Sequence, residues 1–192
     1  SITVFGAHGP SRGARLVVGR TAYLAGYPNG VLYAYNFDAP WTATWKNGVG
    51  STAANPRLVG RFEETGTKYA SFLAAASNGR VYYAGRRERE GVGAGVGSYD
   101  PATGAFDGHH DALETYTPAG LFDDAASSNI LLSTTLVHRG AGDEAKLILY
   151  DYDLHEKERL EVKPGIASTG ELFAGRTPRQ LLGVVVSRKD DP

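Results

Sequence analysis

The sequence predicts an all-β protein built from repeated four-stranded sheets. Three observations support this fold class: a composition rich in turn and strand residues, short apolar runs bounded by tight-turn sequences, and a strand order that recurs along the chain. The 192 residues include 25 glycines and 11 tyrosines. Tyrosine favours strands, and abundant glycine without a collagen period is typical of a protein with many tight turns.

A recurring order of strand, tight turn, strand, loop and strand is the strongest of these signals. It is found over residues 15–36, 72–100 and 121–151. The turns are Gly19-Arg20, Ser77-Asn78-Gly79 and Ser127-Ser128-Asn129, and the third strands end on Tyr35-Asn36, Tyr99-Asp100 and Tyr150-Asp151. Gly, Asn and Ser are well suited to tight turns. We therefore interpret the chain as an internal repeat.

A fourth strand fits between successive repeats, at residues 2–5, 57–62 and 105–106. A further unit starts near Gly170 and contains the apolar run 181–188. Four short strands in each unit of roughly 40–60 residues are typical of β-propeller blades. Such blades stack because one small sheet cannot bury both of its faces alone.

We predict a single β-propeller domain over residues 1–192, with about three and a half four-stranded blades. The blades are expected at residues 14–62, 71–109, 120–162 and 170–192, the last of them truncated. Natural propellers typically have about four to eight blades, so this count predicts an incomplete ring. The sequence holds no methionine, even at position 1, so we expect a processed product or a piece of a longer protein.

The segment Tyr99-Asp100-Pro101-Ala102-Thr103-Gly104 is the most specific part of the pattern. It is similar to a strand-end turn common in bacterial propellers, where proline, threonine and glycine close a hairpin. With the repeats, it makes essentially the whole chain resemble the broad group of Kelch-like, quinoprotein-like and lactonase-like propellers. This resemblance implies an architecture and not an activity.

Residues 144–161 allow two interpretations. Their glutamate, lysine and leucine content favours a helix. Ile148, Tyr150, Tyr152 and Leu154, however, alternate with the period of two that is typical of a strand. We predict strand here. Two insertions lengthen the first two units, at residues 38–56 and 86–95.

Composition excludes several kinds of partner and site. The net charge of −1 gives no global field that would attract nucleic acid or an anionic membrane. The absence of cysteine excludes disulfides and thiolate metal sites, and there is no apolar run of about 18 residues that could span a membrane. We expect a soluble protein that binds neither nucleic acid nor membrane; its compartment stays open, with a secreted or periplasmic location favoured.

Three motifs resemble catalytic or binding signatures but lack a defining feature. Residues 9–13 match Gly-x-Ser-x-Gly, yet a strand follows where a nucleophile elbow needs a helix, so we expect an interblade loop. Residues 91–97 miss the spacing of a phosphate loop, and a flexible hairpin tip is expected. Residues 151–155 suggest a calcium loop without its glycine and glutamate, so a strand with one solvated face is expected.

His109-His110-Asp111 is the most chemically versatile triplet in the sequence. Adjacent histidines can supply metal ligands or acid–base groups, and an aspartate can orient one of them. Consecutive strand residues point to opposite faces, so the two histidines converge only in a loop. We expect a solvated loop, with a ligand-contacting histidine as the alternative and a metal site as the least favoured reading.

Cationic and aromatic side chains recur at equivalent loops of the predicted blades. Loops after the second and fourth strands of a blade emerge on the same face. The candidate ligand-binding residues on this face are Tyr27, Arg86, Arg87, His109, His110, His138 and Arg139. Guanidinium groups suit carboxylates and phosphates, and aromatic faces suit sugar rings. The alternative is an ordinary charged loop surface, in which Glu88 and Glu90 neutralise the arginines.

We expect a binding module that recognises an anionic or glycan-like ligand, or a protein, through this face. One alternative is an enzyme of the propeller lyase or lactonase type, for which Arg86, His109 and His110 are the candidates by architecture alone. Another is a structural half-ring completed by a second chain or by self-association. An enzyme is the less favoured reading of this chain, and the sequence assigns no catalytic residue, metal or cofactor. The aromatic insertion from Trp41 to Trp45 is expected on the opposite face, as a partner contact or as packing at a blade edge.

Overall fold

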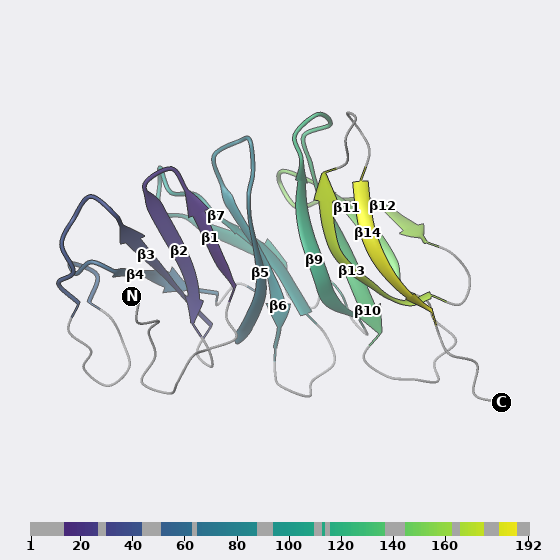
Figure 1. The fold of residues 1–192 in the computed structure, drawn as a ribbon, viewed down its shortest axis with the longest axis horizontal. Helices are drawn as coiled ribbons and strands as arrows, with labels where there is room; N and C mark the ends of the chain where they lie inside the picture. Colours follow the sequence, from purple (N-terminus) through teal and green to yellow (C-terminus); the bar gives the residue numbers. More distant parts are fainter. Residues whose placement is uncertain are drawn as a thin grey trace.

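A computed structural model describes residues 14–26, 30–43, 51–62, 65–87, 94–109, 113, 116–136, 145–162, 166–174 and 181–187 of the chain. Within these ranges all regular secondary structure is β-strand, which confirms the all-β prediction. The strands form sheets that lie side by side in a row, from β1–β4 at one end to β9–β14 at the other (Figure 1).

Three antiparallel sheets of four strands each follow one another along the chain, as the repeat predicted. Sheet 1 consists of β1 (Arg15–Val18), β2 (Thr21–Gly26), β3 (Val31–Asn36) and β4 (Arg57–Arg61). Sheet 2 consists of β5 (Tyr69–Ala75), β6 (Val81–Arg86), β7 (Ala94–Tyr99) and β8 (Phe106–His109). Sheet 3 consists of β9 (Tyr116–Asp124), β10 (Asn129–Leu136), β11 (Lys146–Asp151) and β12 (Glu156–Glu161).

A further antiparallel pair, β13 (Ile166–Ala174) and β14 (Leu181–Ser187), follows sheet 3. It joins β10 through the pairing of Thr135 with Ser168. The sheets have the strand order and size of propeller blades, whereas closure of a ring stays a prediction. Residues 2–5 and 9–13, expected as a strand and a loop, lie outside the described residues.

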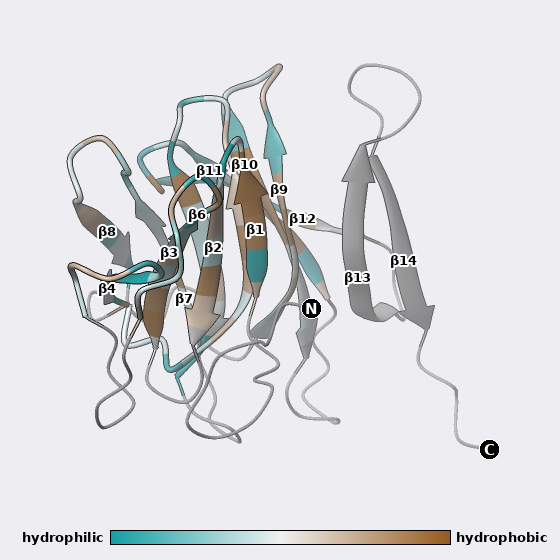
Figure 2. Cartoon of the chain, turned by 60° about the vertical axis from the view of Figure 1, so that its left-hand side comes forward, coloured by the Kyte–Doolittle hydropathy of each residue, from teal (hydrophilic) through white to brown (hydrophobic). Residues whose placement is uncertain are grey.

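The middle sheet is buried on both faces. Hydrophobic residues lie in the strands, β1 and β2 among them, while most of the described turns are hydrophilic (Figure 2). Along β6, Val81 and Tyr83 pack against sheet 1, while Tyr82 and Ala84 pack against sheet 3. All four side chains are at most 1% exposed. Successive strand residues point to opposite faces, so one short apolar run supplies both contacts. Burying a large apolar side chain contributes roughly 1.5–3 kcal/mol, so β6 contributes to the packing of the middle sheet against both of its neighbours.

Glycines in β7 mark close packing instead of a flexible tip. A Cβ on Gly95 would overlap the fully buried Thr65, and a Cβ on Gly97 would overlap the ring of Tyr83. The expectation of a flexible hairpin tip over residues 91–97 is therefore wrong for residues 94–97, which belong to β7. Residues 91–93 lie outside the described part of the chain.

The repeated strand-end residue has the same role in each sheet. Its side-chain oxygen accepts a hydrogen bond from the backbone two residues later, which starts a tight turn. The pairs are Asn36 Oδ1 with Asp38 N at 2.9 Å, Asp100 Oδ1 with Ala102 N at 2.8 Å, and Asp151 Oδ1 with Asp153 N at 3.0 Å. The turns that follow β3, β7 and β11 thus share one mechanism.

Residues 144–161 contain two strands, β11 and β12, as the period-two alternation predicted. Ile148 and Tyr150 are buried in the core. The expectation that 151–155 continues a strand is wrong beyond Asp151, because the turn from β11 to β12 occupies the next four residues. Leu154 adopts φ 64° in this turn and is buried, so core packing holds a non-glycine residue in the left-handed region.

Candidate binding site at one end of the strands

Antiparallel order brings exposed basic side chains to one end of sheets 1 and 2. The second and fourth strands of each sheet end there, and the first and third begin there. This cationic end consists of Arg15, Arg61, Lys68, Arg86, Arg87 and His109, all of which are exposed. Among the described end residues of these two sheets, the charged side chains are basic except for that of Asp107.

The connection from β4 to β5 fixes how Arg61 and Lys68 are presented. Phe62 N donates to Gly30 O at 2.8 Å, and Gly30 N donates to Lys68 O at 3.2 Å. Gly30 has φ +57°, and a Cβ there would overlap Thr67 O, so the close approach requires glycine. These bonds pin the chain where it crosses between the sheets.

Arg86, the cation at the end of β6, is bonded through its backbone to the residues that lead into β5. Tyr69 pairs with Arg86, and Lys68 N donates to Arg86 O at 3.0 Å. The described connection is also braced internally, because buried Thr65 Oγ1 lies 2.8 Å from Thr67 Oγ1. Lys68 and Arg86 therefore project from backbone that hydrogen bonds already hold, which lowers the cost of ordering them when a ligand binds.

His109 is the last residue of β8 and not part of a loop. It pairs with Val96 of β7, and its side chain is exposed. The loop expectation for His109 is therefore wrong, because no turn separates it from the strand. Because strand residues alternate between the two faces of a sheet, Asp107 and His109 lie on the same face of sheet 2. Asp107 Oδ1 accepts a hydrogen bond from Gly108 N at 2.8 Å.

Of the three candidate catalytic residues, the structure describes Arg86 and His109, and it does not place them on adjacent strands. Arg86 and His109 lie on β6 and β8, with β7 between them, which separates their backbones by roughly 10 Å. Within the described ranges, no group of three or more His, Asp or Glu side chains could hold a metal ion. Tyr27, His110, His138 and Arg139 lie outside the described residues.

Arg15 and Arg61 belong to this end but were not among the predicted site residues. Arg61 ends β4, and Ala14, next to Arg15, donates to Ala70 O at the start of β5. Arg61 could have been predicted from the sequence, because it ends a fourth strand and the second and fourth strands end on one face. Arg15 depends on the packing of sheet 1 against sheet 2, which no local pattern reports.

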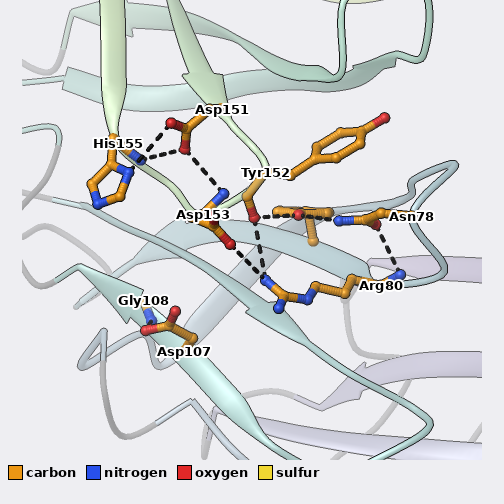
Figure 3. Close-up of polar contacts among 9 residues, drawn as sticks. Asn78, Arg80, Asp107, Gly108, Asp151, Tyr152, Asp153 and His155 are labelled. Atoms are coloured by element: carbon orange, nitrogen blue, oxygen red, sulfur yellow. Dashed lines mark hydrogen bonds and ion pairs between the residues drawn. The ribbon is translucent and has the colours of Figure 1, made fainter.

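A second polar cluster, at the opposite end, joins sheet 2 to sheet 3 (Figure 3). The Tyr152 hydroxyl donates to Asp123 Oδ1 at 2.7 Å and lies 2.6 Å from Ser77 Oγ. The Tyr152 carbonyl accepts bonds from the Tyr82 hydroxyl at 2.6 Å and from Arg80 Nη1 at 3.3 Å. The β5–β6 turn, the end of β9 and the β11–β12 turn thus meet around Tyr152.

Both tyrosines of this cluster are held as neutral donors. Burial raises the pKa of Tyr82, although bonds from Asn78 and Arg80 oppose this. Burial also raises the pKa of Tyr152, and the Asp123 carboxylate adds to the increase, while Ser77 lowers it. Because each polar group is used in a contact between sheets, we interpret the cluster as a structural junction.

The chain has no match among protein-family models, and no curated protein is similar to it in sequence. The part of the chain that the structure describes has no helix with the length and apolar character required to span a membrane.

Proposed function

We propose that the chain is a binding module that holds an extended anionic ligand, such as an acidic glycan, at its cationic end. The observation that carries this proposal is the alignment of exposed basic side chains across two packed sheets. Guanidinium groups bind carboxylates and sulfates through paired hydrogen bonds. Packed sheets lie about 10 Å apart, so a ligand that contacts both is longer than a single small anion.

The described backbone next to Arg61 and Lys68 supports the same proposal. Phe62 N donates to Gly30 O, and Lys68 bonds through its backbone to Gly30 and Arg86. These bonds hold the backbone beside both cations, which lowers the entropic cost of binding there. Because the net charge is −1, local groups of basic side chains, and not a field of the whole molecule, must attract an anion.

The test measures binding of dextran sulfate, with neutral dextran as the control ligand. We expect Arg86→Ala combined with Arg87→Ala to weaken dextran sulfate binding by roughly three- to thirtyfold, the effect of losing two exposed charge contacts. The dependence of the affinity on salt should also decrease, because fewer ions are displaced.

The matched control is Arg20→Ala combined with Arg57→Ala, which removes the same charge at the opposite end of sheet 1. This variant should bind dextran sulfate almost as tightly as the native chain. Equal losses in both double variants would show that net charge alone attracts the polymer, and no binding by the native chain would reject the site.

A further inference from the structure

Three aromatic rings form a partly exposed surface at the end of sheet 1 opposite the cationic end. This aromatic platform consists of Tyr35, Phe37 and Trp41. The Tyr35 ring lies 5.3 Å from that of Phe37 at 88°, and 5.7 Å from that of Trp41 at 46°. Phe37 is 37% exposed and Trp41 is 45% exposed. Large aromatic side chains usually contribute most when buried, so exposure of two adjacent rings needs an explanation.

The tyrosine at the end of the third strand is buried in sheets 2 and 3, but in sheet 1 it forms part of the platform. Tyr35 is equivalent to Tyr99 and Tyr150, which are each 2% exposed. Tyr99 packs edge-on against Tyr23 of the preceding sheet, with the ring centroids 6.1 Å apart. Tyr35 instead packs against Phe37 and Trp41, which the segment after β3 supplies.

The side chain of Asn55 fixes the segment that carries these rings. Its Nδ2 donates to the carbonyls of Asn36, Ala39 and Pro40 at 2.9, 2.9 and 3.2 Å. Its Oδ1 accepts from Asn36 N at 2.8 Å. One amide therefore binds both ends of the segment from 36 to 40 and holds the platform in place before any ligand arrives.

A paired acid and base border the rings. Arg20 Nε and Nη2 donate to Asp38 Oδ1 at 3.0 and 2.6 Å, and the two side chains are 69% and 59% exposed. The Arg20 guanidinium lies 5.9 Å from the centroid of the Phe37 ring. The pair is neutral overall, and it offers hydrogen-bond donors and an acceptor side by side.

We propose that the aromatic platform binds a ring of a neutral saccharide, which goes beyond the anion-binding function proposed above. The apolar C–H face of a sugar ring stacks on Trp41, and its hydroxyl groups, which both donate and accept hydrogen bonds, meet Arg20 and Asp38. The neutral pair gives no preference for a charged ligand.

The size of the surface favours a sugar over a protein partner. A stable protein interface covers roughly 800 Å² on each side. Phe37 and Trp41 together expose on the order of 200 Å², given that such side chains bury 150–250 Å² each. One or two sugar rings match that area.

The experiment titrates the native chain by calorimetry with cellohexaose, xylohexaose, mannohexaose and hexa-N-acetylchitohexaose. At least one of these neutral hexasaccharides should bind. Trp41→Ala should weaken that binding by roughly tenfold, while Trp41→Phe, which keeps a smaller ring, should retain part of it. Because Trp41 is half-exposed, the thermal midpoint of either variant should stay close to the native value.

Leu160→Ala is the matched control, since Leu160 is 41% exposed on β12, far from the platform. It should leave saccharide binding unchanged, as should Arg86→Ala combined with Arg87→Ala. Trp41→Ala in turn should leave dextran sulfate binding unchanged, so the two sites fail independently. The proposal is overturned if none of the four saccharides binds, or if a folded Trp41→Ala chain binds them as tightly as the native one.

Discussion

Two buried tyrosines in the core between sheets 2 and 3 differ only in what their hydroxyl groups contact. Tyr82 accepts a bond from Asn78 Nδ2 at 2.8 Å and donates to Tyr152 O at 2.6 Å. The hydroxyl of Tyr150 is buried with no hydrogen-bond partner in the described structure. Burial raises the pKa of Tyr150 far above its ordinary value, so the group stays protonated. Replacing each tyrosine by phenylalanine therefore shows how much its hydroxyl group contributes to the free energy of unfolding while the ring is kept.

We expect Tyr82→Phe to lower the free energy of unfolding by about 1–3 kcal/mol, because it removes two partly buried hydrogen bonds, each worth about 0.5–1.5 kcal/mol. Tyr150→Phe should change the free energy by less than about 0.5 kcal/mol or increase it, since it removes an unsatisfied hydroxyl. Urea unfolding monitored by circular dichroism measures both. The reverse order of effects would contradict the hydrogen bonding described for Tyr82.

At the scale of the element, the strand-end turns explain why the repeat keeps Asn or Asp after tyrosine. The backbone N–H of Ala102 lowers the pKa of Asp100, with Thr103 adding to the effect. Burial raises the pKa of Asp151, but bonds from the backbone and side chain of His155 outweigh it and lower the net value. Both carboxylates are thus more acidic in the folded chain than in the unfolded one.

A lowered pKa makes these turns sensitive to acid. The contribution of Asp100 and Asp151 is present above about pH 4, where both are ionised in the unfolded chain, and is lost as pH falls through their lower folded values. We expect Asp100→Asn combined with Asp151→Asn to flatten the fall in stability below pH 4. Stability at pH 7 should change little, because Asn36 shows that an amide starts the same turn. Urea midpoints across this pH range give the slope, and an unchanged slope would argue against the proposed role.

The glycines of β7 give a second prediction for an element. Gly97→Ala should destabilise the chain by about 1–3 kcal/mol or more, because the new Cβ overlaps the Tyr83 ring in a packed core. Gly19→Ala is the matched comparison: it meets no atom within 4 Å, and only its φ of +55° makes it costly, by about 1 kcal/mol. Thermal unfolding ranks the two variants. A milder effect at Gly97 than at Gly19 would mean that β7 is not packed as described.

At the scale of the whole molecule, the sheets form a row because the middle sheet packs through both of its faces, with β6 contributing side chains to each. Turn residues and apolar alternation predicted the three sheets, since both signals are local in sequence. The placement of His109 was wrong because no local signal shows that β8 extends to it. The packing of Thr65 on Gly95, and the approach of Arg15 to sheet 2, depend on contacts between sheets and left no trace in the repeat.

The same limit applies to the candidate site. Arg86 and Arg87 could be predicted from the end of a second strand, whereas their alignment with Arg61 and Lys68 depends on the pinned β4–β5 connection. The proposed anion site combines side chains of two sheets, whereas the sequence repeat predicts the strands of one sheet at a time. We therefore propose a spatial arrangement, in which one end of the row binds anions.

A two-dimensional ¹⁵N NMR titration of the 20.4 kDa chain with short dextran sulfate tests that claim most directly. We predict that the largest shift changes fall on the amides of Arg61, Lys68, Arg86, Arg87 and His109, with neutral dextran giving none. Shift changes centred on the turns at the opposite end, at residues 36–39, 76–80 and 152–155, would contradict the claim, as would changes spread evenly over the chain.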